Sequence, residues 1–314
     1  MASRIVIALG GNALQKQGEA SAIDQQKEAV QTARQLVPLI AQGHQIVIVH
    51  GNGPQVGDIL LHEEAINTSE NPTMPLDSCG AMSQGSIGYW LQQAIGNELK
   101  KQGIDMPVAT VLTQTVVDSA DVAFQNPSKP IGPFYASESE ARTAAEARKF
   151  VVKEDSGRGW RRVVPSPMPK SIVEKPVIEE LINKGYLVIA AGGGGVPVVE
   201  TDDGFKGVEA VIDKDMSAAV MADMIDAETL IILTSVDAVT IHFRKPDETA
   251  LHRVTVEEMQ HYCDTQEFGA GSMMPKVLAS IAFVQKKRGR RKTIIGSLDK
   301  VQQSIAGETG TIIS

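Results

Sequence analysis

The sequence predicts an α/β protein with a mostly parallel sheet. In three places a run of apolar, strand-forming residues stops abruptly at glycine. A strand that ends in a glycine turn before a helix directs free backbone N–H groups at an anion. Such turns indicate an enzyme that handles phosphates or small anions at the carboxyl ends of its strands. The predicted strands are 4–9, 45–50 and 186–191, and their glycine turns are 10–12, 51–53 and 192–195.

The composition is that of a globular protein with an excess of acidic residues. The chain has 314 residues, 42% hydrophobic and 22% charged, enough for one large α/β domain or two lobes. A formal net charge of -8 disfavours nucleic-acid binding, which needs a basic surface. The two cysteines, Cys79 and Cys263, give no disulfide framework. Because no apolar run is long enough for a membrane span and no signal-peptide pattern occurs, we expect a cytoplasmic protein.

Helical patterns follow the first two predicted strands. Residues 23–42 carry apolar side chains at helical spacing and end at Gly43, and Pro38 is expected to kink this helix. Residues 77–103 predict a second long helix, which is rich in glycine. Because glycine lowers helix stability, we expect close packing against a neighbour or a ligand there. A third strand is predicted at 106–112, and alternating strands and helices indicate right-handed crossovers in a mainly parallel sheet.

The pattern changes between residues 121 and 170, where six of the fifteen prolines fall. A capping box of Ser137 and Glu140 predicts a short helix, and a hairpin is predicted to pair 150–153 with 160–164. We interpret 121–170 as an insertion that forms a small lid-like subdomain. The later elements are predicted to be helices at 176–184 and 217–225 and strands at 229–234, 239–243, 293–296 and 311–313.

Three lysines stand in conspicuous settings. Lys129 lies in a proline-rich turn, and Lys276 begins a helix. Lys214 lies between Asp213 and Asp215. No Walker-A loop, dinucleotide fingerprint, nucleophile elbow or zinc pattern occurs, so phosphate charge would have to be offset by lysines outside any single loop. The lysines are also compatible with solvated surface groups, and 213–215 with a turn in which Asp215 caps the following helix.

The glycine turns also allow two interpretations. The turns at 10–11 and 51–53 are compatible with tight strand–helix connections that bind nothing. Four consecutive glycines at 192–195 are costly to order, which favours contact between backbone and ligand. The basic run 286–292 is interpreted as the solvated end of a helix, where cations suit the helix dipole. His50 is interpreted as a residue that positions its neighbours through a hydrogen bond.

Seven segments carry a recognisable pattern in order along the chain. They are IVIALGGNA (5–13), HGNGPQVG (50–57), PSKPIG (127–132), EDSGRGW (154–160), GGGGVP (192–197), AVIDKD (210–215) and GSMMPK (271–276). Together they resemble the carbamate kinases of the amino-acid kinase superfamily, over essentially the whole chain. The departures are slight: Ser156 stands where alanine is usual, and Val196 where isoleucine is common.

The resemblance implies an architecture and an activity. The fold would be a three-layer α/β/α sandwich around about eight mainly parallel strands, with a protruding subdomain at 121–170. Residues 1–185 would form the N-terminal lobe, which carries the acceptor site and the dimer interface, and 186–314 the C-terminal nucleotide-binding lobe. The implied reaction interconverts ATP plus carbamate and ADP plus carbamoyl phosphate, with Mg²⁺ carried mainly by the nucleotide. The implied setting is a homodimer that makes ATP in fermentative arginine or related catabolism.

The resemblance also implies residue roles. Lys129, Lys214 and Lys276 would contact the transferring phosphoryl group and the nucleotide phosphates, and Asp215 would orient them. Ala8 stands where many superfamily relatives carry a lysine, and Lys129 is implied to replace it. The implied carbamate and phosphoryl ligands are Gly10, Gly11, Asn12, Gly51, Asn52 and Gly53. The implied nucleotide-binding residues are Gly193, Gly194, Asp213, Thr234, Ser235, Asp237, Met273 and Met274.

The chemistry of carbamate agrees with this set of residues. Carbamate attacks through an oxygen that is already anionic, so alignment and charge neutralisation suffice without a general base. Because the lysines come from different lobes, we expect closure to complete the site. Two alternatives stay open: another kinase of this fold, such as an acetylglutamate or aspartate kinase, and a catalytically silent nucleotide-binding regulator. The presence of all three lysines disfavours the regulator.

Overall fold

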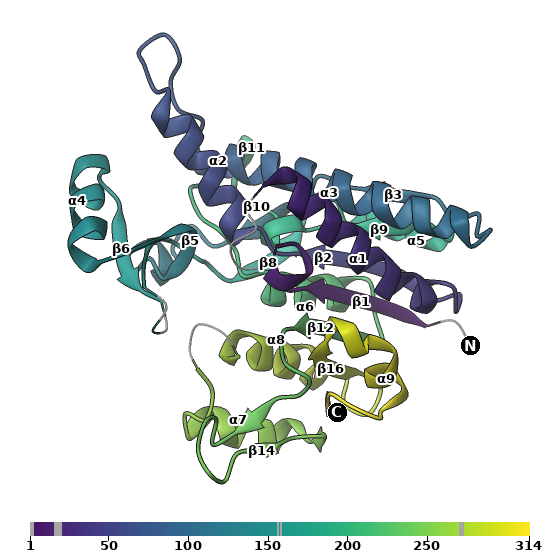
Figure 1. Ribbon diagram of the computed structural model, residues 1–314. Helices are drawn as coiled ribbons and strands as arrows, with labels where there is room; N and C mark the ends of the chain where they lie inside the picture. Colours follow the sequence, from purple (N-terminus) through teal and green to yellow (C-terminus); the bar gives the residue numbers. More distant parts are fainter. Residues whose placement is uncertain (1–2, 16–20, 156, 158, 270–272) are drawn as a thin grey trace.

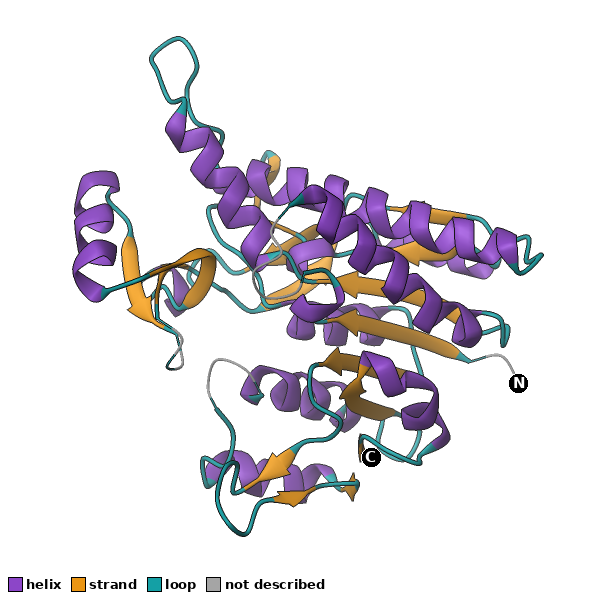
Figure 2. Cartoon of the chain, viewed as in Figure 1, coloured by secondary structure: helices purple, strands orange, loops and turns teal. Residues whose placement is uncertain are grey.

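A sheet of eight strands runs through the molecule (Figures 1 and 2). The computed structural model describes residues 3–15, 21–155, 157, 159–269 and 273–314. Among the described strands of this sheet, β17 runs antiparallel to β16, and the other neighbours are parallel. In spatial order the strands are β15 (Arg253–Val254), β17 (Thr311–Ile313), β16 (Lys292–Ser297), β12 (Thr229–Thr234), β1 (Arg4–Leu9), β2 (Gln45–His50), β9 (Leu187–Ile189) and β3 (Val108–Thr110).

Helices cover both faces of this sheet, because its central strands are apolar on both sides. On β1, Ile5, Ile7 and Leu9 face one hydrophobic cluster, and Val6 and Ala8 face the other. The three-layer α/β/α prediction is therefore confirmed. The first cluster includes α1 (Ala22–Ile40), α3 (Leu76–Lys101) and α9 (Val301–Ala306); the second includes α5 (Lys175–Asn183), α6 (Lys214–Met224), α7 (Val256–Asp264) and α8 (Met274–Gln285).

The glycines of α3 meet the expectation of close packing at only one position. A Cβ on Gly88 would lie 2.4 Å from Cγ2 of Thr110, so this glycine lets β3 approach the helix. At the other three, no described atom outside the helix's own backbone lies within 4 Å of the Cβ position, so the described chain supplies no such neighbour. These three open glycines are Gly80, Gly85 and Gly96.

A second sheet has the order β11-β10-β4-β8, and its strands were not predicted. They are β11 (Gly204–Gly207), β10 (Val196–Thr201), β4 (Gln114–Val117) and β8 (Pro169–Ile172). The strand predicted at 239–243 is also different. It shrinks to β13 (Thr240–Ile241), which pairs with β14 (Thr249–Ala250) outside the main sheet. His242 and Arg244 have φ values of 53° and 61°, and this left-handed backbone ends the strand.

The predicted insertion is a small subdomain that protrudes from the body, at the left in Figure 1. It consists of α4 (Glu138–Arg148) and a sheet with the order β5-β7-β6. The predicted hairpin is confirmed, with Val151 opposite Val163, although Ser156 in its turn lies outside the described residues. The capping box is only half formed. Ser137 accepts from the N–H of Glu140, whereas Glu140 accepts from the N–H of Ala136. The strands are β5 (Lys129–Tyr135), β6 (Val151–Glu154) and β7 (Trp160–Val164).

The subdomain rests on α2 (Gly53–Ala65), where two backbones meet. A Cβ on Gly57 would lie 2.0 Å from the amide nitrogen of Gly132 in β5. Only glycine permits this approach. The contact therefore fixes where the first residue of β5, Lys129, stands relative to the main body.

The two predicted lobes share the main sheet. β1 pairs with β12 from Ile5 opposite Thr229 to Leu9 opposite Leu233. β9, which follows the predicted lobe boundary at 185, lies between β2 and β3 among the N-terminal strands. None of the helices in the described residues combines the length and apolar character that a bilayer span requires.

The basic run 286–292 follows α8, as predicted, but it is not simply solvated. Lys286 pairs with Asp223 at 2.6 Å, and Lys287 pairs with Asp226 at 2.6 Å. Arg291 contacts both aspartates and is only 3% exposed. The positive charge of this run is therefore largely used within the chain.

Candidate active site

Three lysines from separate elements converge on two aspartates. Lys129 begins β5, Lys214 begins α6, and Lys276 lies in the first turn of α8. Lys129 Nζ lies 2.5 Å from Oδ2 of Asp213. Lys214 Nζ and Lys276 Nζ lie 2.8 and 3.1 Å from the two carboxylate oxygens of Asp215. The carboxylates thus hold the three ammonium groups in fixed positions.

Asp213 has a second role, because it is the N-cap of α6. Its Oδ1 accepts from the N–H of Asp215 at 2.9 Å and of Met216 at 3.4 Å. Asp215 was the predicted cap; it lies inside the helix, which begins one residue before it. The pKa of Asp213 is lowered: burial opposes the charged form, but the charges of Lys129 and Lys214 outweigh it.

Asp215 is only 1% exposed and bridges two of the lysines. The pKa of Lys214 is raised, because Asp215 and Asp213 outweigh the effect of burial. The pKa of Lys276 is lowered by burial and by the nearby charge of Lys214. The two neighbouring cations therefore differ in how strongly they hold their protons.

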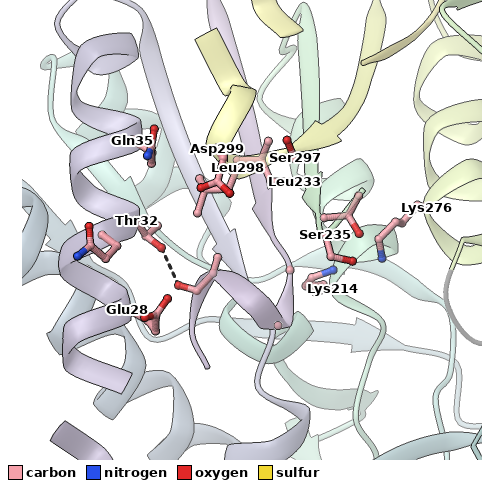
Figure 3. A pocket seen from close by; sticks show the side chains of 15 residues that line it. Glu28, Thr32, Gln35, Lys214, Leu233, Ser235, Lys276, Ser297, Leu298 and Asp299 are labelled. Atoms are coloured by element: carbon pink, nitrogen blue, oxygen red, sulfur yellow. Dashed lines mark hydrogen bonds between the residues drawn. The ribbon is translucent and has the colours of Figure 1, made fainter. Parts of the chain in front are cut away.

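The larger of two cavities at this cluster has a volume of about 630 Å³. Figure 3 shows Lys214, Lys276 and Ser235 at one end of it. The walls near the lysines include the backbone of the first glycine turn and the carboxyl end of β12. The far side is formed by α1 and by the turn after β16. The residues that line this nucleotide-sized cavity include Gly10, Gly11, Glu28, Thr32, Gln35, Thr234, Ser235, Ser297 and Asp299.

The smaller cavity, of about 150 Å³, shares Gly11 and Lys214 with the larger one. We call it the acceptor cavity. α2 begins here, so the first-turn N–H groups of Gly53 and Gln55 lie at this wall, whereas Pro54 between them has none. A Cβ on Gly51 would lie 3.1 Å from Cδ of Lys214, so glycine leaves room for that side chain. The residues that line it include Gly11, Gly51, Asn52, Gly53, Gln55, Lys129, Gly193 and Lys214.

The four glycines at 192–195 are explained by packing within the protein. A Cβ on Gly193 would lie 2.1 Å from Nδ2 of Asn52, and one on Gly194 would lie 2.4 Å from the carbonyl oxygen of Ile212. A Cβ on Gly192 would lie 2.4 Å from Nε2 of His50, and one on Gly195 would lie 2.0 Å from Oγ1 of Thr115. Close contact with neighbouring protein atoms therefore accounts for the run without a ligand. Only Gly193 lies in the wall of the acceptor cavity.

His50 lies beside this run and is buried. Its Nδ1 lies 2.9 Å from the carbonyl oxygen of Gly51. Burial lowers the pKa of His50 to about 4, so its ring is neutral near pH 7. This geometry agrees with a positioning role.

Comparison with known proteins decides the family. The model of the amino acid kinase family matches residues 3–297. The carbamate kinase of Pyrococcus horikoshii is 51% identical, with 100% of each chain covered, and carbamate kinase 1 of Enterococcus faecium is 50% identical at the same coverage. The chain belongs to the carbamate kinases. Among solved structures of the family, carbamate kinase from Giardia lamblia bound to AMP-PNP matches with a TM-score of 0.89 and 41% identity, over 99% of this chain and 98% of that one.

In this member of the family, most of the predicted site residues come together around the two cavities. Some lie elsewhere. Asp237 bonds to Ser297 and Lys300 rather than lining either cavity. Met273 and Met274 pack against the hydrophobic cluster beneath α8. The carbonyl of Gly194 accepts from Thr115 and Ser217, and for Asn12 only the backbone, in a 3-10 turn (Gly11–Ala13), is described.

Sequence reasoning missed the contribution of α1 to the larger cavity. Gln25, Glu28 and Thr32 lie on the buried stripe of this helix, together with alanine and leucine. Polar side chains at helical spacing within an apolar stripe are unusual unless that face meets polar groups or a cavity. This pattern was the available signal.

Proposed function

We propose that this chain transfers a phosphoryl group reversibly between ATP and carbamate, with the larger cavity holding the nucleotide and the acceptor cavity holding carbamate. The single observation that carries the proposal is the shared wall. Lys214 and Gly11 line both cavities, so a group passing between the two ligands remains in contact with them. A volume of about 150 Å³ suits an acceptor of a few heavy atoms better than acetylglutamate or aspartate.

The lysines supply charge where the transferring phosphoryl group gathers it. Lys276 would approach from the nucleotide side, Lys129 from the acceptor side and Lys214 from between them. Their aspartate partners hold them before substrate binds, so little reorganisation is needed when phosphate oxygens arrive. Carbamate brings its own anionic oxygen, which agrees with the neutral, buried state of His50.

We propose that Mg²⁺ enters with the nucleotide. Within the described residues there is no group of three histidine, cysteine, aspartate or glutamate side chains placed to hold a metal. The carboxylates nearest the lysines, Asp213 and Asp215, are already paired. Such a donor set fits an ion held mainly by phosphate oxygens, where it would neutralise charge on the transferring group.

We also propose a homodimer, with the outer face of α3 as the contact. On this face Gly85 and Gly96 have no neighbouring atom within 4 Å of their Cβ positions in the described chain. Met82 and Tyr89, on the same helix, are 46% and 55% exposed. A second copy packed on this face would account for glycines that otherwise only weaken the helix. A monomer by light scattering at micromolar concentration would contradict this part.

The direct test is ATP formation from ADP and carbamoyl phosphate by the purified protein with Mg²⁺. We expect turnover with carbamoyl phosphate and none in the forward direction with N-acetylglutamate or aspartate as acceptor. Turnover with either larger acceptor, or ATP formation that does not need added divalent cation, would contradict the assignment. A protein that binds nucleotide without turnover would be the silent regulator.

A further inference from the structure

The acceptor cavity must recognise two chemically different ends of its ligand. Carbamate has two oxygens at one end, which accept hydrogen bonds, and an amino group at the other, which donates them. Lys129, Lys214 and the first-turn N–H groups of α2 are all donors. They suit the oxygens but leave the amino group without a partner. A site specific for carbamate therefore needs an acceptor in this wall.

Asn52 provides that acceptor. Asn52 lines the acceptor cavity, although the residue is only 5% exposed. The amide nitrogen, Nδ2, donates to Oγ of Ser83 at 2.8 Å. Oδ1 accepts no hydrogen bond from any described residue, and it is not sealed from solvent as a fully buried atom would be. This nearly buried residue of the cavity wall therefore keeps one acceptor atom without a described protein partner.

Ser83 determines which end of the amide faces the cavity. Its hydroxyl donates to the carbonyl oxygen of Gly80 at 2.6 Å, so the single hydroxyl proton is committed there. Toward Asn52, Ser83 Oγ can therefore only accept. The atom that faces it must be the amide nitrogen, which leaves Oδ1 for the cavity. Ser83 is itself 0% exposed, so water does not disturb this arrangement.

Two neighbours complete the argument. Gly193 packs against the amide group, because a Cβ there would lie 2.1 Å from Nδ2 and 2.7 Å from Oδ1. Gln55 also lines the cavity, but it is a weaker candidate. Its Nε2 donates to Gln15 and Gln25, and its Oε1 is closed to solvent.

We propose that Asn52 Oδ1 accepts a hydrogen bond from the amino group of carbamate or carbamoyl phosphate, and that Ser83 acts as the positioning residue that fixes the amide in this orientation. This inference rests on the proposed function of the same cavity. An acetyl group has a methyl where carbamate has NH₂, so it would leave the buried acceptor unpaired. Such a mismatch costs about 10- to 100-fold in discrimination.

The test compares carbamoyl phosphate with acetyl phosphate as phosphoryl donors to ADP. Asn52→Leu, which keeps the size but removes the acceptor, should lower the kcat/KM ratio of the two donors about 10- to 100-fold. Ser83→Ala should lower it about 10-fold, because the amide is free to turn. Ser86→Ala is the matched control: its hydroxyl donates within the same helix, to the carbonyl of Ser83, without contacting Asn52. It should leave the ratio unchanged.

A purely structural role predicts a different outcome. If Ser83→Ala and Asn52→Leu slow both donors by the same factor, or if Ser86→Ala shifts the ratio as much as Ser83→Ala does, the proposal is wrong. A second measurement needs no variant. Phosphonoacetamide and 2-oxopropylphosphonate are stable analogues that differ only in NH₂ against CH₃, and the wild-type protein should bind the first about 10-fold more tightly or better. Equal binding of the two analogues would overturn the proposal. If the protein prefers phosphonoacetamide but forms no ATP, that result would count only against the kinase assignment.

Discussion

Replacing Lys214 with methionine should separate catalysis from folding. Methionine keeps the straight, apolar part of the side chain and removes the charge. Lys214 lines both cavities, so its charge would act on the phosphoryl group throughout transfer. Two unit charges about 4 Å apart in an effective dielectric of about 20 interact by roughly 4 kcal/mol. Since each 1.36 kcal/mol is tenfold, kcat/KM should fall roughly 10³-fold.

The cost in folding should be much smaller. Asp215 keeps Lys276 at 3.1 Å and Asp213 keeps Lys129 at 2.5 Å, so neither carboxylate loses its last partner. We expect about 1 kcal/mol, which lowers Tm by roughly 1–2 °C in a chain of this length. The assay is ATP formation from ADP and carbamoyl phosphate, with thermal unfolding of the same preparations. Lys170→Met, which removes an exposed pair with Asp118, should change neither quantity appreciably. Near-normal turnover, or activity lost only in step with unfolding, would refute the reasoning.

Three further perturbations test the cluster and its setting. Asp213→Asn keeps a helix cap but cannot ionise. Because the pKa of Asp213 in the folded protein is lowered from 3.8, the wild type should lose stability below about pH 4, and the urea midpoint of the variant should fall less steeply with acid. Identical slopes for the two proteins would contradict this. Because the pKa of Lys276 is lowered, this lysine loses its charge below the usual 10.5, and kcat/KM should fall as the pH rises through that range. Lys276→Arg should shift this fall in kcat/KM to higher pH, and an unchanged pH profile would contradict the assignment. Gly57→Ala should displace Gly132 and with it Lys129. Turnover should fall roughly 10²-fold, while the main core unfolds at nearly the same temperature. Turnover equal to that of the wild type would show that the contact is dispensable.

The central sheet was predictable because its strands are buried on both faces. Residues 45–50 and 229–234 are almost continuous runs of apolar, β-branched side chains, and such runs are typical of parallel strands. The second sheet gave no such signal. Its strand Gln114–Val117 is four residues long and mixes polar with apolar side chains, so its pairing depends on partners far along the chain.

The site divides in the same way. Lys129, Lys214 and Lys276 were predictable from local motifs, whereas the cavity wall formed by α1 depends on how that helix packs. The glycines at 192–195 allow two interpretations for a physical reason. A ligand and a neighbouring side chain both require the absence of a Cβ, and sequence alone does not distinguish them. Here Asn52, His50 and their neighbours occupy the space.

The pairing of β1 with β12 has a consequence for how substrates enter. Five successive residue pairs join β1 and β12, so strands from the N-terminal and C-terminal halves form one continuous sheet. The two halves cannot separate without breaking these buried backbone hydrogen bonds. We therefore propose that the expected closure is a movement of the protruding subdomain, which contacts the main body through α2. Because Lys129 begins β5 and already lies at the acceptor cavity, paired with Asp213, an outward movement of this subdomain would carry its charge away from that cavity.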